Sequence, residues 1–214
     1  TNLTWTYTET TKTLTIEGSG AMYDYRYGID PSCPWYKYRN EMEIVIIGDY
    51  VTSIGDLAFY NCSSLTSITI PSSIISLDGW AFNNCSNLGN VKVVVSDYSE
   101  FCNNNIVRSL NYPIQILDKE GNEITEYIIP DGVTDIGEYA FRNCKGLTSI
   151  TMSNSIKTIG ARSFEGCSGL VSISFSEQLT RIEENAFYNC SSLSSVVIPD
   201  SLTSIGYYAF NNCK

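Results

Sequence analysis

The chain has 214 residues, and its 13 lysines and arginines against 23 aspartates and glutamates give a formal net charge of -10. It contains no histidine, which excludes a serine–histidine–aspartate triad, a histidine-ligated metal and any imidazole proton relay. The acidity argues against nucleic-acid binding, because neutralising phosphates requires clustered lysine and arginine. No run approaches the roughly 18 apolar residues that predict a membrane-spanning helix.

The first segment predicts a β-hairpin. Apolar residues alternate with polar ones at Leu3, Trp5 and Tyr7, and again at Leu14 and Ile16, on either side of a polar turn. Alternation with a period of two is typical of a strand with one buried face. We expect this hairpin, within a cap over residues 1–41, to cover the open end of the core that follows.

A short pattern then recurs along the chain. Each copy has a small residue, a phenylalanine and, three residues later, a cysteine; these cysteines are Cys62, Cys85, Cys144, Cys167, Cys190 and Cys213. Neighbouring cysteines are 23 residues apart, except that 59 residues separate Cys85 from Cys144. Such a period predicts a solenoid of stacked units over residues 42–92 and 129–214.

Within one unit the apolar spacing changes. Leu65, Ile68 and Ile70 fit the pattern of a short strand, whereas Ile54, Ala58 and Cys62 are four apart and indicate one or two helical turns. Burying the apolar set of one unit gains about 10 to 20 kcal/mol. Ordering two dozen residues costs at least as much, so the units must stack on each other.

Residues 93–128 break the repeat and predict an irregular unit with an insertion. The spacing of Tyr98, Phe101, Cys102, Ile106 and Leu110 predicts a helix. Residues 113–129 predict a second hairpin around the turn at 118–122.

The last unit stops at Lys214, before its leucine strand. We expect an exposed apolar end formed by Ile205, Ala209 and Phe210, through which two copies of the chain would associate.

Together these features resemble the BspA-like leucine-rich-repeat family, whose units read I-P-x-x-V-x-x-I-G-x-x-A-F-x-x-C-x-x-L. Residues 42–214 carry this pattern, and the opening segment matches the family's leading motifs with N-L-T-W at 2–5, G-S-G-A-M at 18–22 and P-W-Y at 34–36. Asp78 and Glu183 replace the glycine of the unit, so a left-handed glycine is not obligatory there.

The resemblance implies an α/β repeat fold: a right-handed leucine-rich-repeat solenoid with a parallel sheet on one face, short helical returns, an N-terminal hairpin cap and one hairpin-containing interruption. It also implies a secreted or cell-surface protein, of bacteria or parasitic protists, associated with adhesion to host matrix proteins and other cells.

The cysteines invite a disulfide or zinc interpretation. We favour packed thiols, because six of them recur at one structural position and no C-x-x-C pair suits a metal. Cys33 and Cys102 lie outside the series and are either an outlying pair or packed thiols. We expect no metal and no cofactor.

Paired carboxylates without histidine are also found in glycosidases. The candidates here are Asp97 with Glu100, Glu120 with Glu123, and Glu183 with Glu184. We interpret them as solvated charges in turns and expect no catalytic residues.

The outward side chains of the strands form the first candidate binding surface. If Ile68 and Ile70 point inward, a mostly small and hydroxylated row points outward: Ser67, Thr69, Asn90, Lys92, Glu126, Ile128, Ser149, Thr151, Ser172, Ser174 and Ser195. This row suits hydrogen bonding to a protein or glycan, although serine and threonine also serve as strand residues without any partner.

Aromatic residues of the cap form a second candidate surface, made of Tyr23, Tyr25, Tyr27, Trp35, Tyr36 and Tyr38. Aromatic side chains with polar tips suit interfaces, but we favour a role in sealing the end of the core.

We therefore expect a non-catalytic extracellular or cell-surface module that binds host or neighbouring-cell proteins, matrix or glycans through its sheet face. Two alternatives stay open: a structural spacer within a larger surface protein, and a glycan-active enzyme with a carboxylate cleft at the insertion.

Overall fold

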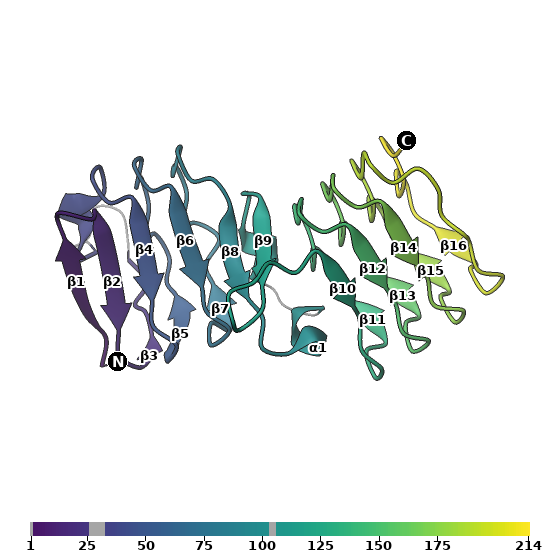
Figure 1. Ribbon diagram of the computed structural model, residues 1–214, viewed down its shortest axis with the longest axis horizontal. Helices are drawn as coiled ribbons and strands as arrows, with labels where there is room; N and C mark the ends of the chain where they lie inside the picture. Colours follow the sequence, from purple (N-terminus) through teal and green to yellow (C-terminus); the bar gives the residue numbers. More distant parts are fainter. Residues whose placement is uncertain (1, 26–32, 103–105) are drawn as a thin grey trace. The chain divides into compact units, whose positions relative to one another are not determined.

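A computed structural model of the chain describes residues 2–25, 33–102 and 106–214 (Figure 1). The chain divides into two compact units. Unit 1 contains Thr1–Val94 and Ser109–Tyr112, and unit 2 contains Val95–Arg108 and Pro113–Lys214. Each unit is a stack of similar coils with parallel β-sheets, as the repeat predicts.

Unit 1 begins with the predicted hairpin, in which β1 (Thr4–Thr8) pairs antiparallel with β2 (Thr13–Glu17). Strand β2 then pairs in parallel with the first repeat strand, and the sheet continues strand by strand through β4 (Ile44–Ile47), β6 (Ser67–Ile70) and β8 (Val91–Val94). A second sheet contains β3 (Gly20–Ala21), β5 (Val51–Ile54) and β7 (Ser76–Leu77). Between β3 and β4 lies the 3₁₀ turn η1 (Tyr36–Tyr38).

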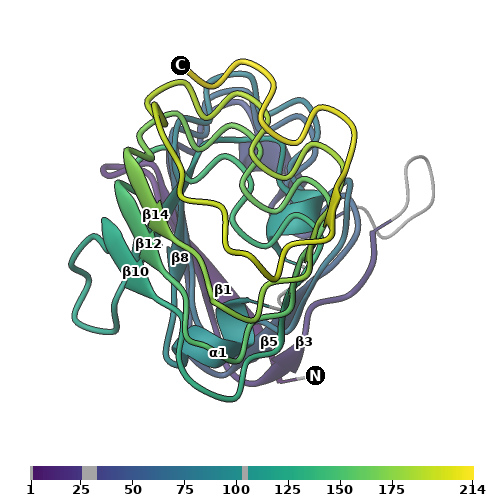
Figure 2. The same ribbon diagram turned by 90° about the vertical axis from the view of Figure 1, so that its right-hand side faces the viewer.

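Unit 2 also has two parallel sheets. One contains β10 (Glu126–Ile128), β12 (Ser149–Thr151) and β14 (Ser172–Ser174), which lie one behind another along one side of the unit (Figure 2). The other contains β11 (Asp135–Ile136), β13 (Thr158–Ile159), β15 (Arg181–Ile182) and β16 (Ser204–Ile205).

The insertion is less regular than its sequence suggests. The expected helix is limited to α1 (Tyr98–Phe101) and the 3₁₀ turn η2 (Val107–Ser109), although Phe101, Cys102, Ile106 and Leu110 are buried as their spacing predicts. The second hairpin is short. After β9 (Ile114–Leu117) the chain turns so that Leu117 bridges Glu123 antiparallel, and it then joins the parallel sheet as β10.

The returning segments of the coils differ from the short helices expected from the sequence. The N–H of Phe141 donates to the carbonyl of Ser163 at 2.7 Å, and that of Phe164 donates to Ala186 at 2.8 Å. A helix would direct these N–H groups to a carbonyl four residues earlier in its own turn. Each coil therefore bonds to the next coil along its returns as well as along its strands.

Residues with positive φ, in the left-handed region of backbone conformation, turn the chain within these returns. The residue before the repeated cysteine has positive φ in each regular coil: 58° at Asn61, 62° at Asn84, 60° at Asn143, 75° at Gly166, 61° at Asn189 and 59° at Asn212. Asparagine and glycine tolerate this conformation best, which accounts for the N-C dipeptide of the repeat. The repeat glycine is restricted by crowding in the coil of Gly160, where a Cβ would lie 2.6 Å from the Ile136 carbonyl oxygen, whereas the coils with Asp78 and Glu183 accommodate a side chain there.

Phenylalanines stack through the core of each unit. In unit 2 the ring centroids of Phe141 and Phe164 are 5.0 Å apart, those of Phe164 and Phe187 are 5.1 Å apart, and the last pair, Phe187 and Phe210, are 5.0 Å apart. In unit 1 the rings of Phe59 and Phe82 are 5.3 Å apart. One phenylalanine per coil thus forms a continuous apolar column.

Each column starts against aromatic residues from outside the regular repeat. In unit 1 the indole of Trp35 stacks on Phe59 at 5.9 Å and donates its Nε1–H to the Ala58 carbonyl at 2.8 Å. In unit 2 the rings of Tyr127 and Phe101 pack edge-on against Phe141, at 4.9 and 5.2 Å. The cap and the insertion therefore have the same role, each sealing the first ring of one unit.

Replacing Ser163 with alanine should stabilise the protein. The Ser163 hydroxyl is buried and has no hydrogen-bond partner in the described part of the chain, while other coils carry alanine at this position, as at Ala186. Burying an unpaired hydroxyl costs about 1–3 kcal/mol, so Ser163→Ala should raise the free energy of unfolding in urea titrations. The reverse change, Ala186→Ser, should lower it; a less stable Ser163→Ala variant would contradict this account.

Replacing Phe164 with alanine should destabilise the protein strongly. The ring is fully buried between two others, so its removal leaves a cavity in the column, at a cost of about 3–5 kcal/mol. Phe210 stacks on Phe187 at the end of the column and is half-buried, so Phe210→Ala should cost clearly less. Equal losses in urea unfolding would show that the column is not the main source of stability.

Candidate binding surface

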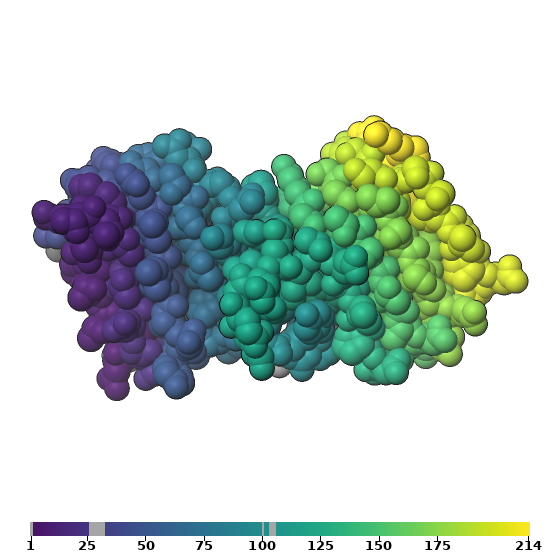
Figure 3. All heavy atoms as spheres, in the orientation of Figure 1, coloured from purple at the N-terminus to yellow at the C-terminus, as the bar shows by residue number. Residues whose placement is uncertain are grey.

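The outward side of β10, β12 and β14 in unit 2 brings together six of the predicted surface residues. The parallel register places Ser149 beside Ser172 and Thr151 beside Ser174, with Glu126 and Ile128 next to them on β10. All are exposed except Ser149, which is half-buried, and the strand residues between them, Tyr127 and Ile150, are buried. Figure 3 shows this side of unit 2 in green.

Ser195 does not join this array. Residues 194–199 form no strand, although the repeat would pair Ser195 with Ser172, and the neighbouring Val197 is 86% exposed. Of the residues expected at the apolar end, Ile205 is exposed, Phe210 is half-buried and Ala209 is buried.

In unit 1 the outward side of the sheet is less polar than the sequence suggested. Ser67, Thr69 and Lys92 are half-buried and Asn90 is exposed. Ile44 and Ile46 also point outward, paired in register with Ser67 and Thr69 and exposed to 39% and 49%. Sequence reasoning missed both, because the run I-V-I-I in β4 has no alternation that would separate its two faces.

The aromatic residues of the cap separate into packed and exposed ones. Trp35 is buried, Tyr25 packs edge-on against it at 5.7 Å, and Tyr38 stacks on Tyr7 with ring centroids 4.0 Å apart. Tyr23 and Tyr36 are exposed to 66% and 38%. Tyr27 lies outside the described residues.

The repeated cysteines line the core beside the phenylalanine column. Four of these thiols donate hydrogen bonds to the carbonyl of the phenylalanine one coil earlier: Cys85 to Phe59 at 3.1 Å, Cys167 to Phe141 at 3.0 Å, Cys190 to Phe164 at 3.1 Å and Cys213 to Phe187 at 3.3 Å. The Cys144 thiol instead lies 3.9 Å from the Arg142 carbonyl. Burial raises the pKa of the Cys167 thiol, and it raises that of Cys190 to about 12. These two thiols are therefore protonated at neutral pH and are poor nucleophiles or metal ligands.

The two cysteines outside the series are also buried. Cys33 donates to the Ala58 carbonyl at 3.3 Å in unit 1, and Cys102 donates to the Tyr98 carbonyl at 3.4 Å in unit 2. Burial raises the pKa of both thiols, that of Cys102 to about 12.

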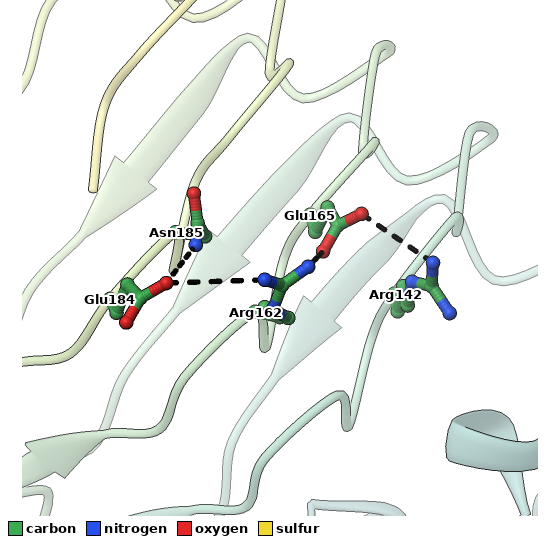
Figure 4. Close-up of polar contacts among 5 residues, drawn as sticks. All are labelled: Arg142, Arg162, Glu165, Glu184 and Asn185. Atoms are coloured by element: carbon green, nitrogen blue, oxygen red, sulfur yellow. Dashed lines mark hydrogen bonds and ion pairs between the residues drawn. The ribbon is translucent and has the colours of Figure 1, made fainter. Parts of the chain in front are cut away.

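Carboxylates on the returns of unit 2 form ion pairs between successive coils. Glu165 lies between Arg142, at 3.5 Å, and Arg162, at 3.3 Å, and Arg162 also approaches Glu184 at 3.9 Å (Figure 4). Glu184 accepts a hydrogen bond from the Asn185 amide at 2.7 Å. Glu183 pairs with Arg181 at 2.8 Å, so neighbouring Glu183 and Glu184 are bound to different partners.

The carboxylates of the insertion are each engaged by a residue close in sequence. Asp97 accepts from the Ser99 N–H at 2.7 Å, Glu120 lies 3.9 Å from the Lys119 ammonium, and Glu123 accepts from the Gln115 amide at 2.8 Å. The side chain of Glu100 lies outside the described part of the structure. Local contacts of this kind are typical of turn residues and helix starts.

Two further properties bear on function. Across the described ranges, no cluster of three or more histidine, cysteine, aspartate or glutamate side chains has a geometry that could hold a metal ion. None of the helices in those ranges has the length and hydropathy needed to cross a bilayer.

A family model for the BspA type leucine rich repeat region matches residues 34–117 and 119–214, with six copies. The chain belongs to this family. The match covers the coils of both units and also all of residues 93–128 except residue 118, which the repeat spacing had set apart as irregular. No curated protein matches the chain.

Several solved structures resemble this chain. A leucine-rich repeat protein from Bacteroides ovatus is 24% identical over 99% of this chain, with a TM-score of 0.49. A leucine rich cell surface protein from Faecalibacterium prausnitzii is 25% identical over 81% of it, with a TM-score of 0.43. The matches cover 55% and 52% of those two proteins, so the chain corresponds to about half of each.

The buried thiol of Cys190 should make stability fall in alkali. Its pKa is raised from 9.0 to about 12 by burial, so the unfolded chain loses this proton first as the pH rises. The stabilising contribution is complete below about pH 9 and is lost as the pH approaches 12. Between pH 7.5 and 10.5 the wild type should lose about 2 kcal/mol more than Cys190→Ala in urea unfolding. Parallel losses in the two proteins would refute the assignment.

Proposed function

We propose that the chain is a non-catalytic binding module whose sheet face recognises host or neighbouring-cell proteins, matrix or glycans. The observation that carries this proposal is the register of β12 and β14, which places Ser149, Ser172, Thr151 and Ser174 side by side. Four hydroxyl groups on two adjacent strands present both donors and acceptors over one surface.

The physical state of this surface suits recognition. Strand β12 is paired on both sides, so its backbone is fixed before any partner arrives. Serine and threonine also lose little side-chain freedom on binding, which keeps the entropic cost of association low. The array is uncharged except for Glu126 at its edge, so it does not repel a partner as the acidic turns of the chain do.

We also propose that the protein is secreted or displayed at the cell surface, as the family resemblance implies. Intact cells of the source organism, labelled with a membrane-impermeant biotin reagent, should yield the biotinylated protein. Recovery from the lysed cell interior alone would count against this location.

A structural spacer is the main alternative, and it predicts that the sheet face has no partner. A glycan-active enzyme receives less support, because Asp97, Glu120 and Glu123 are each held by a neighbouring residue and Glu183 and Glu184 are engaged by ion pairs or an amide.

Lysine substitutions across the face should abolish binding without unfolding the protein. The variant carries lysine at Ser149, Thr151, Ser172 and Ser174, and we expect its affinity for matrix proteins and glycan arrays to fall at least about tenfold, because bulky charges cover the hydroxyl groups. Binding is measured by surface plasmon resonance against immobilised matrix proteins and by fluorescence on the arrays.

A control variant adds the same charge elsewhere on unit 2. It carries lysine at four exposed positions away from the face: Asn154, Ser191, Ser204 and Asn211. The control should bind as the wild type does. If both variants bind equally well, the sheet face is not the site, and if the wild type binds nothing, the spacer alternative is favoured.

A further inference from the structure

The last coil of unit 2 leaves a hollow beside β14. The coil is bonded to the one before it in two places: β16 pairs with β15, and the N–H of Phe187 donates to the Ala209 carbonyl at 2.7 Å. At the third place, β14, the sheet ends, and residues 194–199 form no strand (Figure 1). The resulting hollow has a volume of about 680 Å³ and lies between β14 and residues 197–201.

Residues at core positions of the repeat are partly exposed to solvent at this hollow. Ile173 and Phe175 are half-buried, whereas the equivalent residues one coil earlier, Ile150 and Met152, are buried. Ile198 opposite them is 43% exposed. Apolar side chains that the repeat would cover thus remain in contact with solvent, at the place where a neighbouring strand is missing.

The free edge of β14 defines the shape of an occupant. Backbone groups of successive strand residues point alternately to the two sides, so those of Ile173 face away from β12. An unpaired edge with a row of such groups is a template for a further strand. An extended peptide bound there forms main-chain hydrogen bonds and places every second side chain towards the open apolar residues.

The charge of the hollow defines the chemistry of that peptide. Its lining includes two carboxylates, Glu177 and Asp200, and no basic side chain. Glu177 and Asp200 occupy equivalent positions in successive coils, 23 residues apart. A lysine or arginine on the occupant would neutralise them, whereas an acidic segment would be repelled.

We propose that this hollow binds an extended peptide segment of a partner protein that alternates apolar and basic residues and pairs with the edge of β14. This site differs from the sheet face, although Ser174 lines both, and it does not depend on the proposed function of that face. It uses backbone pairing and charge, while the face presents hydroxyl groups.

The first test uses synthetic peptides. The probe is a fluorescein-labelled hexapeptide of alternating valine and lysine, with blocked ends, titrated with the full chain and followed by fluorescence anisotropy. We expect saturable binding that weakens at high salt. A peptide in which glutamate replaces lysine, and one whose strand-pairing amides are N-methylated, should both bind at least about tenfold more weakly. Equal binding of the N-methylated peptide would overturn the strand-pairing mechanism.

The second test uses variants of the chain. Val197→Lys with Ile198→Lys places two positive charges at the hollow and should weaken binding of the valine–lysine peptide at least about tenfold. The control variant, Tyr50→Lys with Ile75→Lys, changes two exposed residues of unit 1, at 77% and 80% exposure, and should bind as the wild type does. Equal weakening in both variants would mean that the peptide binds by net charge alone.

A third measurement locates the contact without a mutation. Hydrogen exchange of the Ile173 amide should slow in the presence of the peptide, because the amide then donates to the added strand. Unchanged exchange at Ile173, or binding of neutral oligosaccharides in place of the peptide, would overturn the proposal. Ser149→Lys with Thr151→Lys changes only β12 of the sheet face and leaves every residue that lines the hollow unchanged. This variant should bind the valine–lysine peptide as the wild type does, so a failure of either site is distinguishable from a failure of the other.

Discussion

Bonding from each coil to the next is the constraint on which the rest of the structure depends. The strands bond along the stack, and so do the returns, where the N–H groups of Phe141, Phe164 and Phe187 all donate to the following coil. Equivalent side chains of successive coils therefore lie one above another, and the phenylalanines stack about 5 Å apart because the backbone spacing requires it. The cysteine thiols then satisfy the carbonyls of these same phenylalanines.

An array of this kind needs a different solution at each place where the repetition stops. Trp35 closes the column of unit 1, and Tyr127 with Phe101 closes that of unit 2, so irregular sequence appears where an open ring must be covered. At β14, residues 194–199 of the described chain add no strand to the sheet. The apolar side chains of β14 are therefore partly exposed and the backbone groups on its outer edge are unpaired within the sheet. These groups are the basis of the proposed peptide site.

The repeat spacing was sufficient to predict the solenoid and the burial of the repeated cysteines, because residues at equivalent positions of successive coils share one environment. The hairpin was predicted separately, from the alternation of apolar and polar residues in the first segment. The repeat spacing did not predict the form of the returns. Residues four apart suggest a helix, but the same spacing arises when left-handed residues such as Tyr139 and Asn143 turn the chain twice in four residues. The register of β12 and β14 followed from the period. The outward direction of Ile44 and Ile46 could be determined only from the structure, because a run of isoleucine and valine has the same hydrophobicity on both faces of the strand.

Each coil contacts only the coil before it and the coil after it. This arrangement limits the ways in which such a protein can change in length. Inserting 23 residues in register adds one complete coil, and deleting 23 residues removes one. The two coils that then meet have interfaces of the same kind, so the phenylalanine column, the thiol hydrogen bonds and both sheets continue across the junction. A change of another size interrupts the column and needs residues of its own to cover the break, as Phe101 and Tyr127 cover Phe141. Genes of this type are therefore expected to grow and shrink in whole coils, which alters the reach of the molecule while its caps stay the same.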